Sequence, residues 1–463
     1  MEFFDTITAI STPAGSGGVG IIRTSGETAV KIAEPLIFAY NKKKLSEFES
    51  HKLVLSQVRS LESSAIIDEA LVVVMKAPHS FTGEDVVEIQ CHGGYIVAKR
   101  ILEELIKAGA RLAQPGEFTR RAFMNGKTDL LKAEGAADLI YASSYLGAEN
   151  AAKTVAGDLS EKINALRDTA LKLAANISAA ADYPDEVEPI AVPFLIQKIE
   201  SMEKEINRLI SGFDTGKILR EGITTVIAGR PNVGKSSLLN ALLREEKAIV
   251  ADLPGTTRDI IEDYVNLKGL TLKIIDTAGI RSEADEIEKI GIERAYKNID
   301  SADLCLFIVN ASEKIEKEDF EIFRRINKRK YIIVANKTDI KGGLTEEEIA
   351  KQLNADKTQV VSTFVPQNGN QDISKLEDKI LEMFFTKEIS SSEVYITGER
   401  QKNALVRAKE ALENIKTNAY ATSLQDLLYI DLENLIAALG EITGKTVREE
   451  IIDEVFANFC VGK

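Results

Sequence analysis

The chain has 463 residues, of which 44% are hydrophobic and 28% are charged, and its formal net charge is −14. This composition is typical of a folded globular protein and excludes both a mostly disordered chain and a small disulfide-stabilised scaffold. So negative a charge argues against sequence-independent binding of nucleic acid through bulk charge, although it leaves an RNA contact at a local patch open.

Cysteine usage and the lack of long apolar stretches bear on the cellular compartment. Cys91, Cys305 and Cys460 are few and lack metal-ligand spacing, which fits a reducing environment. The first ten residues hold no basic leader, and no stretch reaches the roughly 20 apolar residues that span a bilayer. We therefore expect a cytoplasmic protein that does not bind membranes.

Residues 1–120 are expected to form a small α+β domain. Apolar runs of strand length at 71–75 and 86–89 are closed by turn residues. A helical stretch follows, with Ile101, Leu102, Leu105 and Ile106 on one side.

Helical periodicity dominates residues 121–215. Apolar residues from Ile163 to Ile177 recur at steps of 3 and 4, as on one face of a long helix. The proline-containing segment 182–193 interrupts the pattern, and a second helix runs toward Gly212. The same spacing returns within residues 385–463, from Leu428 to Leu439. We expect one helical domain built from 121–215 and 385–463, on both sides of an inserted domain at 216–384.

Strand-length apolar runs alternate with helical patterns in this inserted domain. They span residues 224–228, 272–275, 304–309 and 331–335. Such alternation predicts a parallel sheet covered by helices on both faces. The expected fold class is therefore multidomain, with α+β, helical and α/β parts.

The segment Gly229–Ser236 matches the phosphate-binding pattern G-x-x-x-x-G-K-S/T, between a predicted strand and a predicted helix. Backbone N–H groups of such a loop surround phosphate oxygens at the positive end of a helix. Lys235 is expected to reach the β- and γ-phosphates, and the Ser236 hydroxyl is expected to bind Mg2+. The residues expected to bind the nucleotide in this segment and directly after it are Asn232, Val233, Gly234, Lys235, Ser236 and Ser237.

A second motif, Asp276–Gly279, follows the run 272–275. The Asp276 carboxylate suits the Mg2+ shell, and the Gly279 N–H group suits the γ-phosphate. Ile280 comes next and cannot polarise water, so another group must orient the attacking water. The acidic candidates, each of which alone also fits a solvated helix start, are Glu283, Asp285, Glu286 and Glu288.

A third motif, Asn336-Lys337-Thr338-Asp339, closes the run 331–335. The Asp339 carboxylate can accept hydrogen bonds from two adjacent guanine N–H groups, a pair that adenine lacks, and the Lys337 stem can cover the base. Ser362 stands where a further base-contacting loop is expected, although the sequence Ser362-Thr363-Phe364 departs from the usual one. The three motifs together predict GTP as the nucleotide.

With these motifs the chain resembles the translation-factor-like P-loop GTPases, and over essentially its whole length it resembles the MnmE (TrmE) family of tRNA modification GTPases. This resemblance implies an N-terminal tetrahydrofolate-binding domain at 1–120, a helical domain and an inserted Ras-like P-loop GTPase domain. The segments that carry it are Asp5–Ile7, Thr12-Pro13, Gly17–Arg23, Phe81–Asp85, His92–Gly94, Pro115–Phe123, Asn125–Lys127, Asp129-Leu130, Gly255–Asp259 and Phe459–Lys463.

For GTP hydrolysis, the resemblance implies roles that the motifs leave open. Thr257 corresponds to a switch threonine that binds Mg2+ with Ser236, and Glu288 corresponds to the water-orienting residue. Asn232 corresponds to a ligand of a K+ ion, held where the G domains of a homodimer meet, although many such loops carry Asn without using K+. This cation supplies positive charge that Ras-like proteins take from an arginine. The other implied K+ ligands are Ala251, Leu253 and Thr256.

For the N-terminal domain, the resemblance implies a site for 5,10-methylenetetrahydrofolate or its 5-formyl analogue. Arg23, Glu88 and Lys127 match positions at this site, where a carboxylate suits the pterin ring and cations suit the folate carboxylates. Each of the three also fits a surface ion pair. Cys460, in the carboxyl-terminal tail, is implied to approach this site and to act there as a thiolate. Together with Lys235 and Glu288 of the GTP site, it completes the set of expected catalytic residues.

The function that the resemblance implies is modification of the wobble uridine of certain tRNAs. An MnmG-like partner that uses FAD and NADH would join the homodimer in a heterotetramer, and an aminomethyl-type group would be attached to carbon 5 of uracil. The nitrogen would come from glycine or ammonium. Two alternatives stay open: a K+-activated ribosome-assembly GTPase switch, and a nucleotide-gated scaffold whose folate domain is degenerate. Direct contact between this chain and tRNA is also open.

Overall fold

The computed structural model describes residues 5–13, 15–245, 262–275, 297–340, 342–363, 373–385, 393–420, 425–457, 459–460 and 462. The chain divides into two compact units. Unit 1 contains Met1–Ala137, Val155–Leu195 and Ala411–Lys463, and unit 2 contains Asp138–Thr154 and Ile196–Glu410. Within the described ranges, no helix combines the length and the apolar composition that crossing a membrane requires.

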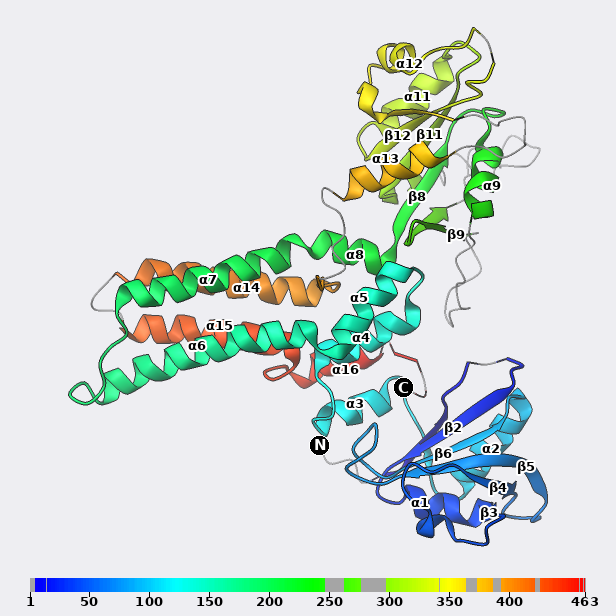
Figure 1. Cartoon of the computed structure of the whole chain (residues 1–463), viewed down its shortest axis with the longest axis vertical. Coiled ribbons are helices and arrows are strands. Elements are labelled where there is room, and N and C mark those ends of the chain that lie inside the picture. The colour runs from blue at the N-terminus through cyan, green and yellow to red at the C-terminus, as the bar shows by residue number, and fades with distance from the viewer. Residues whose placement is uncertain are drawn as a thin grey trace. The chain divides into compact units, whose positions relative to one another are not determined.

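A seven-stranded sheet forms the amino-terminal part of unit 1, in the order β3-β4-β5-β6-β2-β1-β7 (Figure 1). Neighbouring strands are antiparallel except for β1 and β7. Two helices share one apolar core with the sheet, in which Ile101 and Leu105 of α2 join Ile22 and Ile89 of the strands. The elements are β1 (Ile7–Ile10), β2 (Val19–Ser25), α1 (Ala29–Ala33), η1 (Glu34–Leu36), β3 (Ile37–Ala39), η2 (Leu45–Glu47), β4 (Val54–Arg59), β5 (Ile66–Met75), β6 (Val86–His92), α2 (Tyr95–Lys107) and β7 (Arg111–Leu112).

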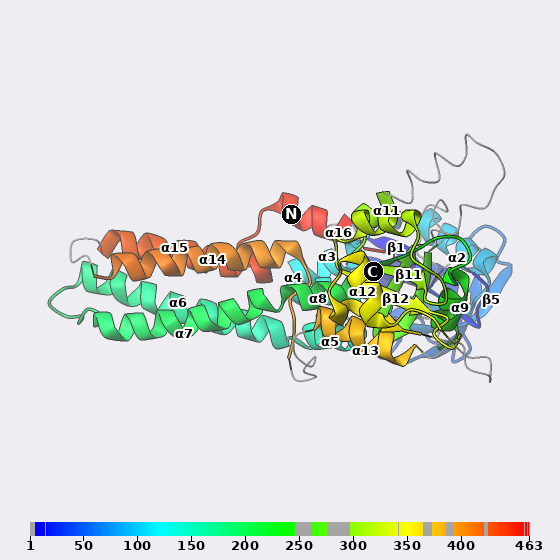
Figure 2. The same ribbon diagram turned by 90° about the horizontal axis from the view of Figure 1, so that it is seen from above.

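The helices of unit 1 include a long pair, α6 and α15, which lie side by side in Figures 1 and 2. The predicted apolar stripes are the buried faces of this pair: Ile163 and Leu173 on α6 are buried, as are Leu432 and Leu439 on α15. Burial of a stripe of this kind is what holds an amphipathic helix in place. The bounds are α3 (Glu117–Met124), α4 (Leu130–Tyr141, ending in unit 2), α6 (Asp158–Asp182), α15 (Gln425–Thr443) and α16 (Glu449–Ala457).

Unit 2 is built around a six-stranded sheet in the order β13-β12-β11-β8-β10-β9. All its strand pairs are parallel except β9 with β10. The elements of this sheet and its helices are β8 (Ile223–Ala228), α9 (Lys235–Glu245), β9 (Glu262–Leu267), β10 (Leu270–Ile275), β11 (Leu304–Asn310), α11 (Lys317–Ile326), β12 (Tyr331–Asn336), α12 (Glu346–Leu353), η3 (Lys357–Gln359), β13 (Val360–Ser362) and α13 (Ser374–Phe384).

Helices cover both faces of the six-stranded sheet, as predicted. Every residue of β11 is buried. Leu306 and Ile308 face the core shared with α9 and α13, while Phe307 and Val309 face the core shared with α11 and α12. This two-sided burial explains why the strands read as continuous apolar runs, and it confirms the predicted fold class.

Polar contacts hold the chain segments that lead into and out of the six-stranded sheet. Asp138 accepts a hydrogen bond from Thr397 at 2.8 Å and pairs with Arg220, at the end of α8, at 3.1 Å. Asn150 donates to the Tyr395 carbonyl at 3.1 Å and accepts from the Tyr395 N–H group at 2.8 Å. Both connections are therefore anchored on α4 and α5. The remaining helices are α5 (Tyr145–Ala156), α7 (Val192–Ser211), α8 (Phe213–Glu221) and α14 (Glu399–Asn418).

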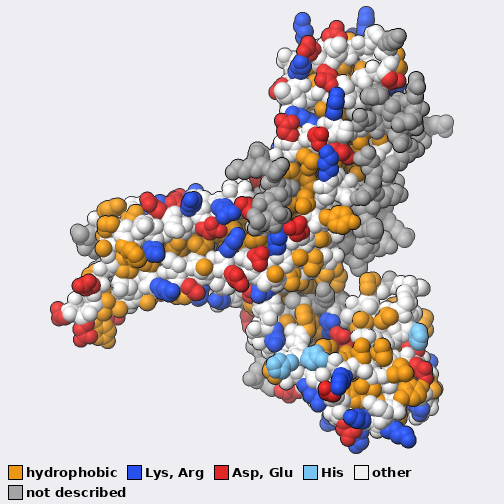
Figure 3. All heavy atoms as spheres, in the orientation of Figure 1, with side chains coloured by type: hydrophobic (Ala, Val, Ile, Leu, Met, Phe, Trp, Pro, Cys, Tyr) orange, Lys and Arg blue, Asp and Glu red, His pale blue; other side chains and the backbone are white. Residues whose placement is uncertain are grey.

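The surface carries both signs of charge. On the face drawn in Figure 3, basic and acidic side chains are interspersed across the helices. Mixed charge of this kind accords with the composition of the chain, which has 72 acidic and 58 basic residues.

Candidate functional site

The loop between β8 and α9 has the backbone of a phosphate-binding loop. Asn232 and Gly234 have positive φ angles of 64° and 106°, and left-handed residues in such a loop produce a concave row of N–H groups that binds anions. A side chain at Gly234 is excluded, because a Cβ atom there would lie 2.0 Å from Asn336 Nδ2. The helix that follows adds the positive end of its dipole.

Lys235, the first residue of α9, is held by this same loop. Its Nζ atom donates to the Gly229 carbonyl at 2.5 Å and to the Arg230 carbonyl at 2.8 Å. Burial lowers the pKa of Lys235, with the Glu318 carboxylate acting in the opposite direction. Asn232, Ser236 and Ser237 are exposed and available to a ligand, whereas Val233 is buried.

The segment after β12 is tied directly to the phosphate-binding loop. Asn336 Nδ2 donates to the Val233 carbonyl at 2.9 Å, and Lys337 Nζ donates to the Asn232 carbonyl at 3.1 Å. The structure thus brings together two motifs that lie about a hundred residues apart in the sequence, with a separation of 103 residues between Asn336 and Val233.

Asp339 and Ser362 line one cavity of about 590 Å3 beside these loops. The loop after β12 and the end of β13 are joined there, since Thr338 Oγ1 donates to the Thr363 carbonyl at 3.2 Å. The Ser362 N–H group donates to Glu346 Oε1 at 2.9 Å. The two segments assigned from the sequence to the base therefore border the same space.

Several predicted site residues lie outside the described residues. They are Ala251, Leu253, Thr256, Thr257, Asp276, Gly279 and Glu288.

In unit 1, Arg23 and Glu88 are cross-strand partners on β2 and β6. Arg23 Nε donates to Glu88 Oε1 at 2.7 Å. The Arg23 guanidinium also lies 5.5 Å from the Phe81 ring centroid and 5.7 Å from that of Phe118, within the range of cation–π attraction. This arginine is held in place by a carboxylate and two aromatic rings.

The carboxyl-terminal tail reaches the same arginine. The Gly462 carbonyl accepts hydrogen bonds from Ser11 Oγ at 3.1 Å and from Arg23 Nη1 at 3.5 Å. Gly462 has φ = 95°, and a Cβ atom there would lie 2.5 Å from the Ile10 carbonyl oxygen. The Cys460 carbonyl accepts from the Gly116 N–H group at 3.3 Å, and Cys460 is half-buried. The tail is therefore docked on the amino-terminal sheet.

Lys127 follows α3 and contacts the loop that carries Phe81. Its Nζ atom donates to the Pro78 carbonyl at 2.9 Å, and a Cβ atom at Gly83 would lie 3.2 Å from its Cγ atom. Arg23 and Lys127 thus both contact the 78–84 loop, although no contact joins them to each other among the interactions described.

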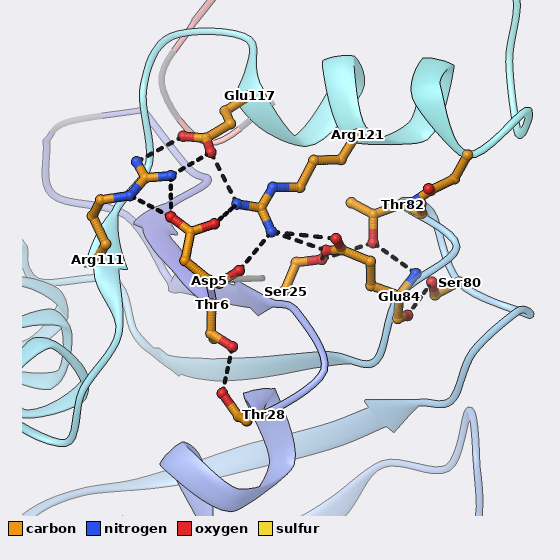
Figure 4. Close-up of polar contacts among 11 residues, drawn as sticks. Asp5, Thr6, Ser25, Thr28, Ser80, Thr82, Glu84, Arg111, Glu117 and Arg121 are labelled. Atoms are coloured by element: carbon orange, nitrogen blue, oxygen red, sulfur yellow. Dashed lines mark hydrogen bonds and ion pairs between the residues drawn. The ribbon is translucent and has the colours of Figure 1, made fainter. Parts of the chain in front are cut away.

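A buried arginine, Arg121 of α3, organises this region (Figure 4). It donates to Asp5 Oδ1 at 2.7 Å, to the Asp5 carbonyl at 2.8 Å, to Glu84 Oε1 at 3.2 Å and to Glu117 Oε1 at 3.0 Å. Glu84 in turn accepts from Ser25 Oγ at 2.6 Å. This network fixes the 78–84 loop against β1, β2 and α3.

The arginines of the network lower the pKa values of Asp5 and Glu117. Burial opposes ionisation of Glu117, but hydrogen bonds from Arg111, from the Gln114 N–H group and from Arg121 outweigh it and lower the pKa of Glu117. Sequence reasoning assigned Arg121 no role. The available signal was its presence, with Asp5, Glu84 and Glu117, in the segments that carry the family resemblance.

Comparison with known families covers nearly the whole chain. A model described as "GTP-binding protein TrmE N-terminus" matches residues 6–127, and one described as "MnmE helical domain" matches residues 130–460. Among solved structures, a crystal structure of Aquifex aeolicus Era bound to GDP and AlF4− is 27% identical and covers 41% of this chain and 66% of that chain. Its TM-score is 0.29, too low to add to the assignment.

Curated relatives match over their full length. The tRNA modification GTPase MnmE of Clostridioides difficile (strain 630) is 43% identical over 461 residues, which is 99% of this chain and 99% of that protein. The protein of the same description from Geobacillus kaustophilus (strain HTA426) is 44% identical over 466 residues and covers 100% of each chain. The chain therefore belongs to the MnmE family of tRNA modification GTPases.

Proposed function

We propose that this protein hydrolyses GTP at the β8–α9 loop and uses that reaction in the modification of the wobble uridine of certain tRNAs. The observation that carries the GTP site is the direct joining of the two motif loops, in which Asn336 and Lys337 donate to the carbonyls of Val233 and Asn232. A loop held in shape before the ligand arrives binds phosphate with a smaller entropic loss. Asp339, which lines the neighbouring cavity, would recognise the guanine base.

Metal ions fit the exposed side of this loop. The Ser236 hydroxyl is exposed at the start of α9 and would bind Mg2+ together with Thr257, near Asp276. Asn232 is exposed as well and would bind K+ with oxygens of Ala251, Leu253 and Thr256. When bound, these cations offset negative charge that develops on the phosphates.

The remaining steps of hydrolysis are assigned to side chains and to assembly. Lys235, held by the carbonyls of Gly229 and Arg230, would contact the β- and γ-phosphates, and the Gly279 N–H group would contact the γ-phosphate. Glu288 would orient the attacking water, since Ile280 has no group that can do so. The G domains of a homodimer would close around the nucleotide and separate after hydrolysis.

The Arg23 region of unit 1 is proposed to bind 5,10-methylenetetrahydrofolate or its 5-formyl analogue. Glu88 suits the pterin ring, while Arg23 and Lys127 suit the folate carboxylates. Docking of the tail supports this assignment, because the Gly462 carbonyl lies on Arg23 and Cys460 is only two residues away in the sequence. Cys460 would act there as a thiolate.

Transfer to tRNA is proposed to require a second protein. An MnmG-like partner holding FAD and using NADH would form a heterotetramer with the homodimer in the cytoplasm. The product would carry an aminomethyl-type group on carbon 5 of uracil, with its one-carbon unit from the folate.

Calorimetry on the full-length protein tests the folate site. Arg23→Ala is expected to abolish binding of 5-formyltetrahydrofolate. Arg59→Ala is the matched control, because Arg59 lies on the same sheet and also stacks on an aromatic ring, with 4.6 Å between its guanidinium and the Phe38 centroid. Equal affinities in the two variants would contradict the assignment. Hydrolysis of GTP by the same protein, and its loss in Lys235→Ala, tests the GTP site separately.

A further inference from the structure

Arg230, the first variable residue of the phosphate-binding loop, does not extend into solvent. Its guanidinium contacts the amino-terminal end of α11, with Nε 2.8 Å from Asp319 Oδ2 and Nη1 3.0 Å from Glu316 Oε2. The Arg230 side chain is 11% exposed and that of Asp319 is 0% exposed. A charged pair therefore joins the loop to a helix that contributes no motif to the GTP site.

Asp319 depends on this pair for the balance of its charge. Its Oδ2 atom also accepts a hydrogen bond from the Glu316 N–H group at 3.0 Å, which caps α11. Its other oxygen, Oδ1, is buried and has no hydrogen-bond partner among the residues that the structure describes. A buried carboxylate is strongly unfavourable unless a cation balances it. Arg230 supplies that cation, so the pair resists separation.

The backbone of Arg230 makes a second contact, with Lys235. Its carbonyl oxygen accepts a hydrogen bond from Lys235 Nζ at 2.8 Å, next to the one that Gly229 accepts. One residue thus connects a buried carboxylate of α11 to the ammonium that loops of this type direct at phosphates.

We propose that Arg230 is a positioning residue for GTP hydrolysis. Its ion pair with Asp319 fixes the backbone at 229–230, and the Arg230 carbonyl then holds Lys235 where the β- and γ-phosphates bind. This inference rests on the GTP site proposed above. Displacement of a catalytic group by about 1 Å typically lowers a rate by about 100-fold, so loss of the ion pair is expected to lower kcat/KM for GTP by about 10- to 100-fold.

The test compares Arg230→Met, Asp319→Leu and the double variant in the full-length protein. The measurements are kcat and KM for GTP, the dissociation constant of a fluorescent GDP analogue, and the melting temperature. Arg230→Met leaves the buried Asp319 carboxylate without its cation, whereas Asp319→Leu removes the buried partner of Arg230 and leaves it Glu316. Each single variant is expected to lower the melting temperature, kcat/KM and GDP affinity. The double variant replaces a buried ion pair by two apolar side chains, a change that commonly restores stability. We expect its melting temperature to recover above that of Arg230→Met, short of the wild-type value because the Glu316 N–H group loses its cap, while its kcat/KM stays low.

Arg230→Lys keeps the charge but loses the planar fork that contacts two carboxylates. Its kcat/KM is expected to fall between the wild-type value and that of Arg230→Met. If the double variant does not fold, Arg230→Lys decides: a loss of kcat/KM at unchanged melting temperature supports the positioning role, and a wild-type kcat/KM overturns it.

Two controls distinguish failure of the positioning role from failure of the proposed GTP site. Arg325→Met removes an exposed arginine of the same helix, paired with Asp300 at 2.7 Å, and is expected to leave kcat/KM unchanged. Lys235→Ala is expected to abolish hydrolysis, and activity retained there would contradict the GTP site itself. If Lys235→Ala is inactive, near-normal kcat/KM in Arg230→Met overturns the positioning role. Recovery of both stability and kcat/KM in the double variant overturns it too.

Discussion

Replacing Arg121 with methionine would remove a fully buried cation from its network. The Arg121 side chain is 0% exposed, whereas that of Arg111, the other arginine of the network among the residues described, is 43% exposed. The substitution leaves the Glu117 carboxylate, 5% exposed, with Arg111 as its remaining ion-pair partner in Figure 4. Breaking a buried ion pair by removing one member typically costs about 3–5 kcal/mol. For a unit of this size, each kcal/mol lowers the melting temperature by about 2–4 °C. We therefore expect Arg121→Met to lower the melting temperature of unit 1 by roughly 6–20 °C.

Arg111→Met is the matched control, because Arg111 pairs with two of the three carboxylates that Arg121 contacts, at 2.7 Å from Asp5 and 2.6 Å from Glu117. Arg111 is 43% exposed and Glu117 keeps Arg121 as a partner, so a smaller fall than in Arg121→Met is expected. Differential scanning calorimetry on the full-length variants measures both. Equal shifts in the two variants would refute the argument that burial of the arginine sets the magnitude.

Lowering the pH should narrow the difference in melting temperature between the wild-type protein and Arg121→Met. The pKa of Glu117 in the folded protein is below its ordinary value of 4.5, so its stabilising contribution is present above that value and is lost as the pH falls through the folded pKa. Without Arg121, burial acts with less opposition, and protonation of Glu117 costs the variant less stability. Melting temperatures measured between pH 7 and pH 3, on either side of that ordinary pKa, check this; a difference that widens toward acid would contradict it.

Four further outcomes are expected. Asp339→Asn should weaken GTP binding and admit xanthosine triphosphate, because an amide N–H group would face the guanine donors whereas xanthine has a carbonyl there; competition binding measures both. Hydrolysis should be faster in K+ than in Na+ at equal ionic strength, because the ion at Asn232 must fit a ring of oxygens. Glu288→Ala should bind GTP normally yet turn over about 100-fold more slowly in single-turnover assays, with Glu283→Ala as its control. Gly462→Ala should release the tail, because its Cβ would lie 2.5 Å from the Ile10 carbonyl oxygen, and should speed reaction of Cys460 with a thiol reagent.

Each of these outcomes has a contrary result. Unchanged GTP affinity in Asp339→Asn would show that this carboxylate does not recognise the base. Equal rates of hydrolysis in K+ and Na+ would contradict the proposed K+ site. Normal turnover in Glu288→Ala together with a loss of turnover in Glu283→Ala would assign the water-orienting role to Glu283. For the tail, Gly94→Ala is the control, since its Cβ would lie 3.8 Å from the nearest atom; equal thiol reactivity in both glycine variants would count against docking.

Local patterns predicted the elements well where one physical requirement dominates. Strand β11 lies between two helical layers, which requires apolar side chains over residues 304–309, and this run was recognisable from composition alone. The stripe from Ile163 to Ile177 became the buried face of α6 because a helix packed on one side needs apolar residues at its own period.

Contacts between distant segments could not be predicted in this way. Arg121 and Asp5 are 116 residues apart, and both read as surface residues because charged side chains are rarely fully buried. Arg230 occupies a variable position of its motif, so the pattern carries no information about Asp319. The Gly462 contact with Arg23 spans 439 residues, and only the folded chain brings the two together.

The chain passes four times between the two compact units, after residues 137, 154, 195 and 410. A single cut by a protease therefore cannot release either unit, because at least one fragment always carries residues of both. Unit 2 would have to be supplied as two polypeptides and unit 1 as three. A nick in an exposed loop thus leaves the fragments associated on gel filtration, and they part only when the units themselves unfold.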